Sequence, residues 1–168
     1  VEHYERRRAS GGVERIVLAD VSASMSEAVS EGKRKIDALR EALAAAPAAR
    51  ILAFSSTPMP IASAADLPVP GGNTALHLAL ELAATFVPAS TLVITDGEPD
   101  NEDSALRSAE RLPGMIDVIY CGPETNQRAR AFLMRLARAG GGRYAAHDLR
   151  RSPAALGPAI RALLTGGT

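Results

Sequence analysis

Residues 16–24 read IVLADVSAS, in which four apolar residues run directly into an aspartate and two serines. A continuous apolar run of this kind is typical of a parallel β-strand that is covered on both faces. The polar residues that follow, Asp20, Ser22 and Ser24, would then stand at the carboxyl end of that strand. Because ligands bind at this end of open α/β sheets, the stretch predicts both a strand and the place of a site.

Apolar runs with strand character alternate with amphipathic helical stretches along the rest of the chain. The segment 57–61 contains two prolines, so it is expected to be at most an edge strand. The alternation predicts a Rossmann-like three-layer αβα sandwich, with helices on both faces of a mostly parallel central sheet that has one short antiparallel edge strand. Expected N-caps of the last three helices are Asp100 or Asn101, Thr125 and Ser152. Besides 16–19, strands are expected at 51–54, 91–95, 116–120 and 143–146, and helices at about 26–46, 74–87, 101–111, 125–139 and 153–164.

The length of 168 residues suits a single domain with its own core. Residues 1–12 are polar and arginine-rich and end in a Ser-Gly-Gly run, so they are interpreted as a flexible lead-in to one domain at 13–168. Lysine plus arginine and aspartate plus glutamate are balanced at 19 each. This balance argues against binding to nucleic acid or to an acidic membrane surface.

The single cysteine, Cys121, can form neither an internal disulfide nor a thiolate metal cluster, and it is interpreted as a small buried hydrophobe. No apolar run is long enough to span a bilayer and no secretory signal is visible, so a cytoplasmic protein is expected. An extracellular protein is the alternative, because the chain begins with valine and a signal could have been removed. The abundance of alanine and arginine points to a bacterial source.

Oxygen-bearing side chains follow the two most apolar strands. Asp20, Ser22 and Ser24 follow the first, Asp96 follows the later one, and Thr74 comes between them after a glycine-rich loop. The carboxyl ends of parallel strands meet at one edge of a sheet, so these five side chains can converge. Because all the donors are oxygens, the set suits a hard cation, namely Mg²⁺, Mn²⁺ or Ca²⁺.

The D-V-S-A-S motif at 20–24, the later Thr74 and the T-D-G motif at 95–97 together resemble the metal-ion-dependent adhesion site of von Willebrand factor A domains. The resemblance extends over about residues 13–164, and the three elements fall in the strand and helix order of that family. Ala23 is a departure, since many members of the family have glycine between the two serines.

The resemblance implies one bound divalent cation, with Mg²⁺ expected first. Ser22 and Ser24 would ligate it directly, Thr74 directly or through water, and Asp20 and Asp96 through water or hydrogen bonds. A neutral set of direct ligands leaves the cation electrophilic with one exchangeable position, which an aspartate or glutamate of a protein partner would fill. For a bacterial cytoplasmic member, the family also implies a partner in a larger assembly, such as a MoxR-type AAA+ ATPase.

Alternative interpretations remain at this stage. Taken singly, each of these residues could cap a helix or stabilise a turn. An enzymatic alternative is a Mg²⁺-dependent phosphatase-like hydrolase of the haloacid-dehalogenase type, but the second carboxylate that such enzymes need two residues after Asp20 is Ser22 here. A third interpretation is a metal-free structural interaction module on the same fold. We expect a metal-dependent binding module and assign no catalytic residue.

Overall fold

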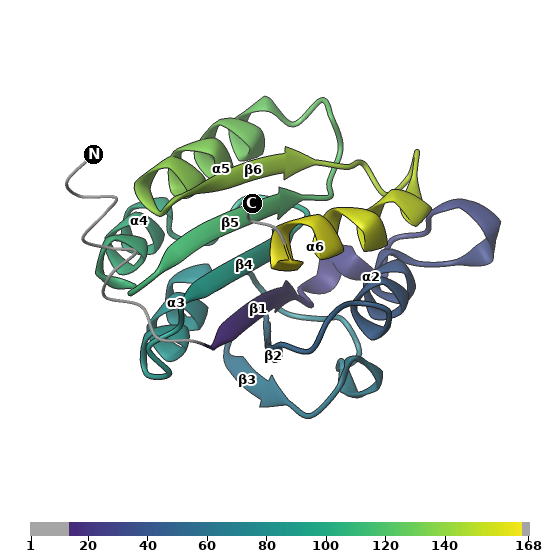
Figure 1. The fold of residues 1–168 in the computed structure, drawn as a ribbon. Coiled ribbons are helices and arrows are strands. Elements are labelled where there is room, and N and C mark those ends of the chain that lie inside the picture. Colours follow the sequence, from purple (N-terminus) through teal and green to yellow (C-terminus); the bar gives the residue numbers. More distant parts are fainter. Residues whose placement is uncertain (1–13, 166–168) are drawn as a thin grey trace.

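Six strands form the central sheet: β1 (Arg15–Asp20), β2 (Arg50–Phe54), β3 (Pro58–Ile61), β4 (Ser90–Thr95), β5 (Met115–Tyr120) and β6 (Gly141–Ala146). The computed structural model describes residues 14–165, so the predicted lead-in at residues 1–12 lies outside the described part. The strand order is β3-β2-β1-β4-β5-β6 (Figure 1). All neighbouring strands are parallel except β2 and β3, which pair antiparallel at one edge.

Helices cover both faces of this sheet: α2 (Lys35–Ala44), α3 (Leu76–Ala84), α4 (Glu102–Arg111), α5 (Gln127–Ala139) and α6 (Leu156–Thr165). α2 and α6 pack on one face, and α3, α4 and α5 pack on the other (Figure 1). The predicted three-layer sandwich, with its mostly parallel sheet and short antiparallel edge strand, is therefore confirmed. Within residues 14–165, no helix has both the length and the apolar character that crossing a bilayer requires.

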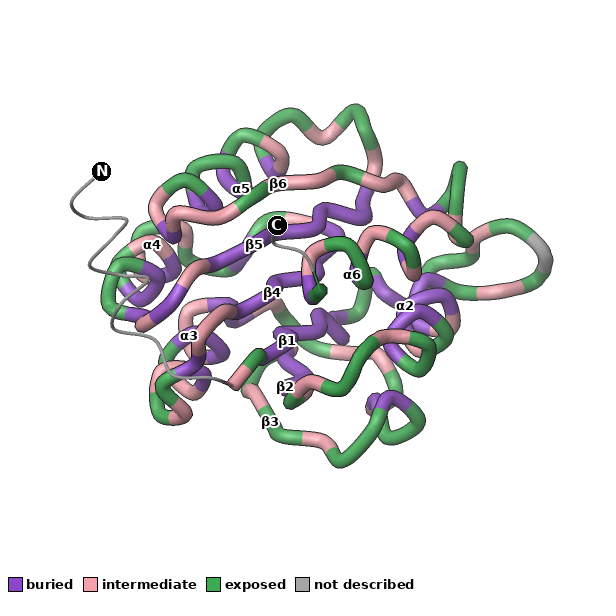
Figure 2. Tube along the Cα trace, viewed as in Figure 1, coloured by how far each residue is buried: buried purple, intermediate pink, exposed green. Residues whose placement is uncertain are grey.

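Successive side chains of β1 enter opposite layers of the core. Ile16 and Leu18 pack with α3, α4 and α5, whereas Val17 and Ala19 pack with α2 and α6, and none of the four is more than 1% exposed. Figure 2 shows β1, β4 and β5 as mainly buried segments in the middle of the molecule. A strand that is covered on both faces needs an apolar residue at every position, which explains the unbroken apolar run.

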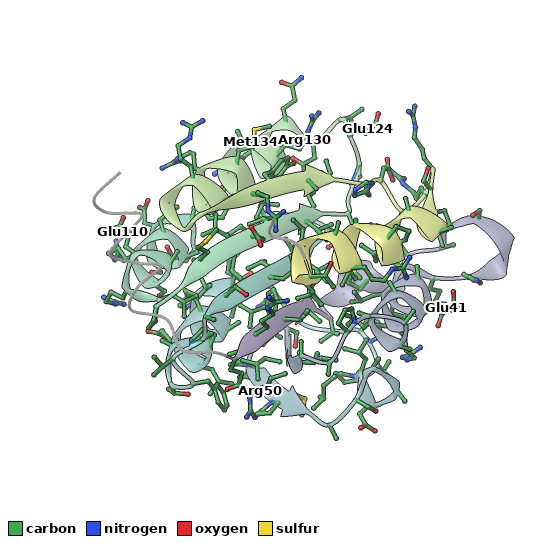
Figure 3. All side chains as sticks on the ribbon, in the orientation of Figure 1. Glu41, Arg50, Glu110, Glu124, Arg130 and Met134 are labelled. Atoms are coloured by element: carbon green, nitrogen blue, oxygen red, sulfur yellow. The ribbon has the colours of Figure 1, made fainter. Side chains whose placement is uncertain are left out.

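Charged side chains stand on the outside of these layers. Glu41 on α2 and Glu110 on α4 are exposed and point away from the sheet (Figure 3). At the start of β2, the guanidinium of Arg50 pairs with Glu14 and lies over the ring of Phe86, 4.2 Å from its centroid. The helices therefore present the polar outer face and apolar inner face that their sequences predicted.

The helix predicted at about 26–46 is wrong in its first part, because regular α-helix begins only at Lys35. The residues before it form two short 3₁₀ turns, η1 (Ala23–Ser26) and η2 (Ser30–Gly32). Gly32 has a φ of +72°, a left-handed conformation that no α-helix accommodates. The apolar residues of this stretch follow a helical periodicity in the sequence, but the backbone turns at Gly32, so no continuous helix forms.

Smaller corrections concern helix starts. Asn126, and not Thr125, caps α5, because its side-chain oxygen accepts from the main-chain N–H of Ala129 at 3.1 Å. The predicted cap at Asn101 is confirmed by an equivalent bond from Ser104. α3 begins at Leu76 and not at Thr74, and α6 follows a 3₁₀ turn, η4 (Pro153–Ala155), in which Ser152 makes no side-chain cap.

Gly122 is buried just after β5 and packs closely against the main chain of the loop after β4. A Cβ at this position would collide with the main-chain oxygen of Asp96. We therefore expect Gly122→Ala to lower the free energy of unfolding by about 2 kcal/mol or more, through overpacking. The measurement is urea unfolding followed by circular dichroism.

The matched control is Gly71→Ala in the loop before α3, where an added Cβ has nothing within 4 Å apart from its chain neighbours. Gly71 does not have a positive φ, so this change should leave stability unchanged or raise it by up to about 1 kcal/mol, because alanine restricts the unfolded chain. Equal effects at the two glycines would contradict the packing described here.

Candidate metal centre

Four of the five predicted ligands, Asp20, Ser22, Ser24 and Asp96, gather at the carboxyl ends of β1 and β4, the two strands in the middle of the sheet. Asp20 is the last residue of β1, and Asp96 follows β4 directly. The chain runs from β1 to β2 on one side and from β4 to β5 on the other, so the two connections diverge. Diverging connections define a topological switch point, which is where open α/β sheets bind ligands.

Asp20 is fully buried and is held by two hydrogen bonds. Its Oδ1 accepts from the main-chain N–H of Ser22 at 2.8 Å, and its Oδ2 accepts from the hydroxyl of Thr95 at 2.6 Å. Burial and the charge of Asp96 raise the pKa of Asp20 to about 6, although the hydrogen bonds from Ser22 and Thr95 act in the opposite direction. A carboxylate in such a place is stabilised by any cation that reaches it.

Asp96 and Ser24 connect the two strand ends. The Ser24 hydroxyl donates to Oδ1 of Asp96 at 2.8 Å, and the hydroxyl oxygens of Ser22 and Ser24 lie 3.4 Å apart. Ser22 and Asp96 are at most 5% exposed, whereas Ser24 is exposed. This network of oxygens is therefore buried at Asp20, Ser22 and Asp96 and reaches solvent at Ser24.

Thr74, the fifth predicted ligand, is held through its main chain by Asp100 in the loop after β4. Its N–H donates to Oδ1 of Asp100 at 2.9 Å, and its carbonyl accepts from the N–H of Asp100 at 2.8 Å. The loop before it is tied to the segment after β1, because the Gly72 carbonyl accepts from the N–H of Ala23 at 3.2 Å. Three loops that are far apart in the sequence therefore meet at one edge of the sheet.

The chemistry of these donors fits a hard cation. Hydroxyl and carboxylate oxygens are preferred by Mg²⁺, Mn²⁺ and Ca²⁺. Between residues 14 and 165, no group of three or more histidine, cysteine, aspartate or glutamate side chains is placed to hold a metal ion. A cation at this centre would therefore depend on the hydroxyls of Ser22, Ser24 and Thr74, while Asp20 and Asp96 supply the compensating negative charge.

A buried lysine, Lys35, completes the centre, and it was not among the residues singled out from the sequence. Its ammonium contacts Oδ2 of Asp96 at 2.9 Å and Oε1 of Glu27 at 2.5 Å. Burial by itself lowers the pKa of Lys35, but the bond to Glu27 and the charge of Asp96 outweigh it and raise the pKa. The sequence did carry a signal, because Lys35 precedes the buried Ala38 and Leu39 by three and four residues and so shares their helix face.

Cys121 follows β5 directly and is fully buried. Burial, together with the charge of Asp96, raises the pKa of its thiol well above the ordinary value. A thiol that stays protonated is a poor nucleophile. The prediction of a small buried side chain at this position is confirmed.

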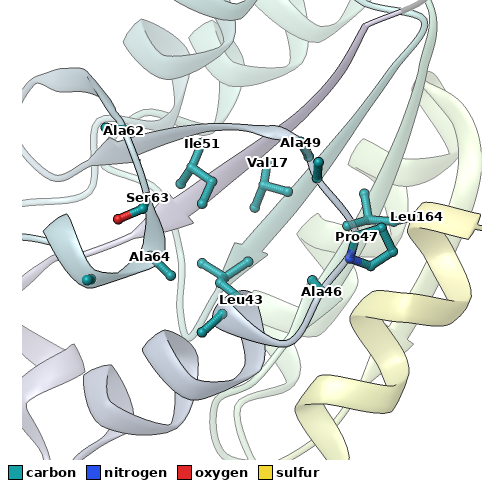
Figure 4. A pocket seen from close by; sticks show the side chains of 13 residues that line it. Val17, Leu43, Ala46, Pro47, Ala49, Ile51, Ala62, Ser63, Ala64 and Leu164 are labelled. Atoms are coloured by element: carbon teal, nitrogen blue, oxygen red, sulfur yellow. The ribbon is translucent and has the colours of Figure 1, made fainter.

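An apolar hollow of about 430 Å³ lies away from these residues (Figure 4). Val17 of β1 and Ile51 of β2 line it together with Leu43 and Leu164, which lie near the ends of α2 and α6. Ser63 is the polar side chain among its lining residues, and none of them is charged. Because ligand pockets need a few polar groups that orient the ligand, the switch point is the better candidate for a functional site.

Comparison with known proteins bears on the fold. No family model and no curated protein matches the sequence. Among solved structures, the chain is similar to a von Willebrand factor type A protein from Catenulispora acidiphila, with a TM-score of 0.67 and 19% sequence identity. The match covers 90% of this chain and 41% of the other. The chain therefore has the fold of a von Willebrand factor type A domain, and it spans less than half the length of that bacterial protein.

The raised pKa of Asp20 predicts how the stability of the metal-free protein depends on pH. Its folded pKa of about 6 lies above the ordinary 3.8, so its contribution is fully present below about pH 3.8 and is lost as pH rises through 6. We expect Asp20→Asn to match the wild type at pH 4 and to be up to about 3 kcal/mol more stable at pH 7.5. Urea unfolding in EDTA across this range measures the difference.

Asp66→Asn, at an exposed position, is the control and should show no such trend. A free-energy difference between Asp20→Asn and wild type that stays constant from pH 4 to 7.5 would contradict the raised pKa.

Proposed function

We propose that this chain is a divalent-metal-dependent protein–protein interaction module, which holds one cation and binds an acidic residue of a partner through it. The observation that carries the proposal is the network of Asp20, Ser22, Ser24 and Asp96 at the switch point. The proposal draws support from the fold, because a von Willebrand factor type A domain commonly mediates protein interactions. Mg²⁺ is the proposed cation, with Mn²⁺ and Ca²⁺ as alternatives of the same oxygen-ligand class.

The roles of the residues follow from their present contacts. Ser22 and Ser24 would hold the cation through their hydroxyls, with Thr74 as a third hydroxyl. Asp20 and Asp96 already accept hydrogen bonds from neighbouring N–H and O–H groups, and Asp96 does so from Ser24 itself. Carboxylates placed behind neutral ligands compensate the charge of a cation without coordinating it, so the bound ion supplies an electrophilic position for the carboxylate of a partner.

We favour a binding module over a phosphatase-like hydrolase. In haloacid-dehalogenase-type enzymes, a carboxylate two residues after the nucleophile acts as the general acid. Ser22 occupies that place here, and its hydroxyl faces that of Ser24 at 3.4 Å. A hydroxyl has no accessible pKa for this role near neutral pH, so Asp20 would lack the proton donor that phosphoryl transfer needs.

The proposed partner is a component of a larger bacterial assembly in the cytoplasm, of which a MoxR-type AAA+ ATPase is one candidate. The similar Catenulispora acidiphila structure is much longer than the matched region. We propose that this chain likewise acts as the recognition part of a larger system, and that it contributes binding and no catalysis.

Calorimetric titration of Mg²⁺ into metal-stripped protein tests the metal site. We expect one ion per chain, and no detectable binding by the double variant Ser22→Ala, Ser24→Ala, because both hydroxyl ligands are gone. At Mg²⁺ concentrations about 100 times the Kd, the wild type should gain about 2.7 kcal/mol of stability. The double variant should gain none.

The matched control is Ser63→Ala, Ser104→Ala, which removes one exposed and one half-buried hydroxyl elsewhere on the domain and should bind Mg²⁺ like the wild type. Partner capture is then compared in Mg²⁺ and in EDTA. Capture that is lost both in EDTA and in the double variant would support the proposal, and capture that persists in both would identify a metal-free module.

A further inference from the structure

Lys35 places a permanent positive charge inside the candidate metal centre. It is 1% exposed, and its side chain and that of Asp96 are each only 2% exposed where they meet. A buried ammonium is stable only when hydrogen-bonded carboxylates surround it, and here Asp96 and Glu27 do so. The neighbouring positions of the same helix face are alanine and leucine, so Lys35 is a charged residue on an otherwise apolar face.

The ammonium and the ligating serine use opposite oxygens of one carboxylate. Oδ2 of Asp96 accepts from Lys35 at 2.9 Å, and Oδ1 accepts from Ser24 at 2.8 Å. A divalent ion held by the Ser24 hydroxyl would therefore share Asp96 with an existing positive charge. Of the two buried carboxylates at the centre, Asp96 is paired with an ammonium, whereas Asp20 accepts hydrogen bonds from the N–H of Ser22 and the hydroxyl of Thr95.

We infer that Lys35 is a built-in counter-ion of this centre, which orients Asp96 and lowers the affinity of the site for the divalent cation. The inference rests on the proposed function. Without metal, the ammonium stabilises a buried carboxylate that would otherwise be unpaired. With metal, the same charge repels the ion, so the bound ion gains more from the carboxylate of a partner that completes its coordination.

Three substitutions at position 35 test this role by Mg²⁺ calorimetry and by thermal unfolding with and without Mg²⁺. Lys35→Met and Lys35→Gln both remove the charge, and glutamine retains a donor for Asp96. Each should bind Mg²⁺ about tenfold or more tightly than the wild type. The reason is that the ammonium, on the other side of the Asp96 carboxylate, repels the divalent ion by an energy that corresponds to about this factor. Lys35→Arg keeps the charge and should bind within about threefold of the wild type.

Lys33→Met is the matched control, since it removes the same charge two residues away, where Lys33 pairs with Glu41 in a partly exposed bridge. It should leave Mg²⁺ affinity within about twofold of the wild type. The neutral variants should also unfold at a lower temperature than the wild type in EDTA and should recover in Mg²⁺. Tighter binding is a result that mere loss of structure at position 35 does not produce.

The outcomes separate the two proposals. Wild-type binding with equal or weaker binding by both neutral variants would overturn the role of Lys35 and leave the metal-dependent module intact. Absence of binding in all proteins would overturn both. A Lys35→Met or Lys35→Gln protein that is unfolded in EDTA and folds in Mg²⁺ supports the inference, because the cation then replaces the ammonium. If both stay unfolded at saturating Mg²⁺, the lysine is a structural residue and the inference fails.

Discussion

Two buried carboxylates, Asp20 and Asp96, impose the constraint on which the rest of the centre depends. They end adjacent parallel strands and are each at most 5% exposed, so their charges act on each other through protein and not through water. The structure compensates with donors from separate elements: a main-chain N–H and a hydroxyl after β1, the Thr95 hydroxyl of β4 and the Lys35 ammonium of α2. Compensating the two charges therefore also ties the middle of the sheet to one helix layer.

The glycine-rich loop before α3 is also part of the candidate metal centre. Gly72 has a φ of +81°, and a Cβ there would lie 2.7 Å from the hydroxyl oxygen of Ser56, so glycine is the residue that fits. Its carbonyl accepts from the N–H of Ala23, which fixes the loop against the serine motif and brings Thr74 to the edge of the sheet. The third hydroxyl of the proposed ligand set thus owes its place to main-chain contacts. Ala23 does not adopt a positive φ, so the turn does not require glycine at this position.

The fold and the side chains support the proposal in different ways. The likeness to a solved von Willebrand factor type A structure concerns the path of the backbone, and at 19% identity it establishes the fold alone. The metal centre is argued from the side chains of this chain and their hydrogen bonds. In the proposed function, carboxylates behind neutral hydroxyl ligands would present a cation to another molecule. In the same proposal, the charge of Lys35 would lower the affinity of the centre for that cation.

The sequence by itself determined the layered α/β architecture and the edge position of the proline-containing strand, and it pointed to Asp20, Ser22, Ser24 and Asp96, which the structure brings together. These follow from local properties: apolar runs specify strands covered on both faces, and residues at the ends of parallel strands share one edge of the sheet. It misjudged residues 26–34, where periodicity continues but Gly32 turns the backbone. Only the tertiary structure decided that Lys35 pairs with Asp96, 61 residues away, and that Thr95 donates to Asp20, 75 residues away. Such contacts depend on how distant segments pack, and the spacing of residues along one chain carries no record of that.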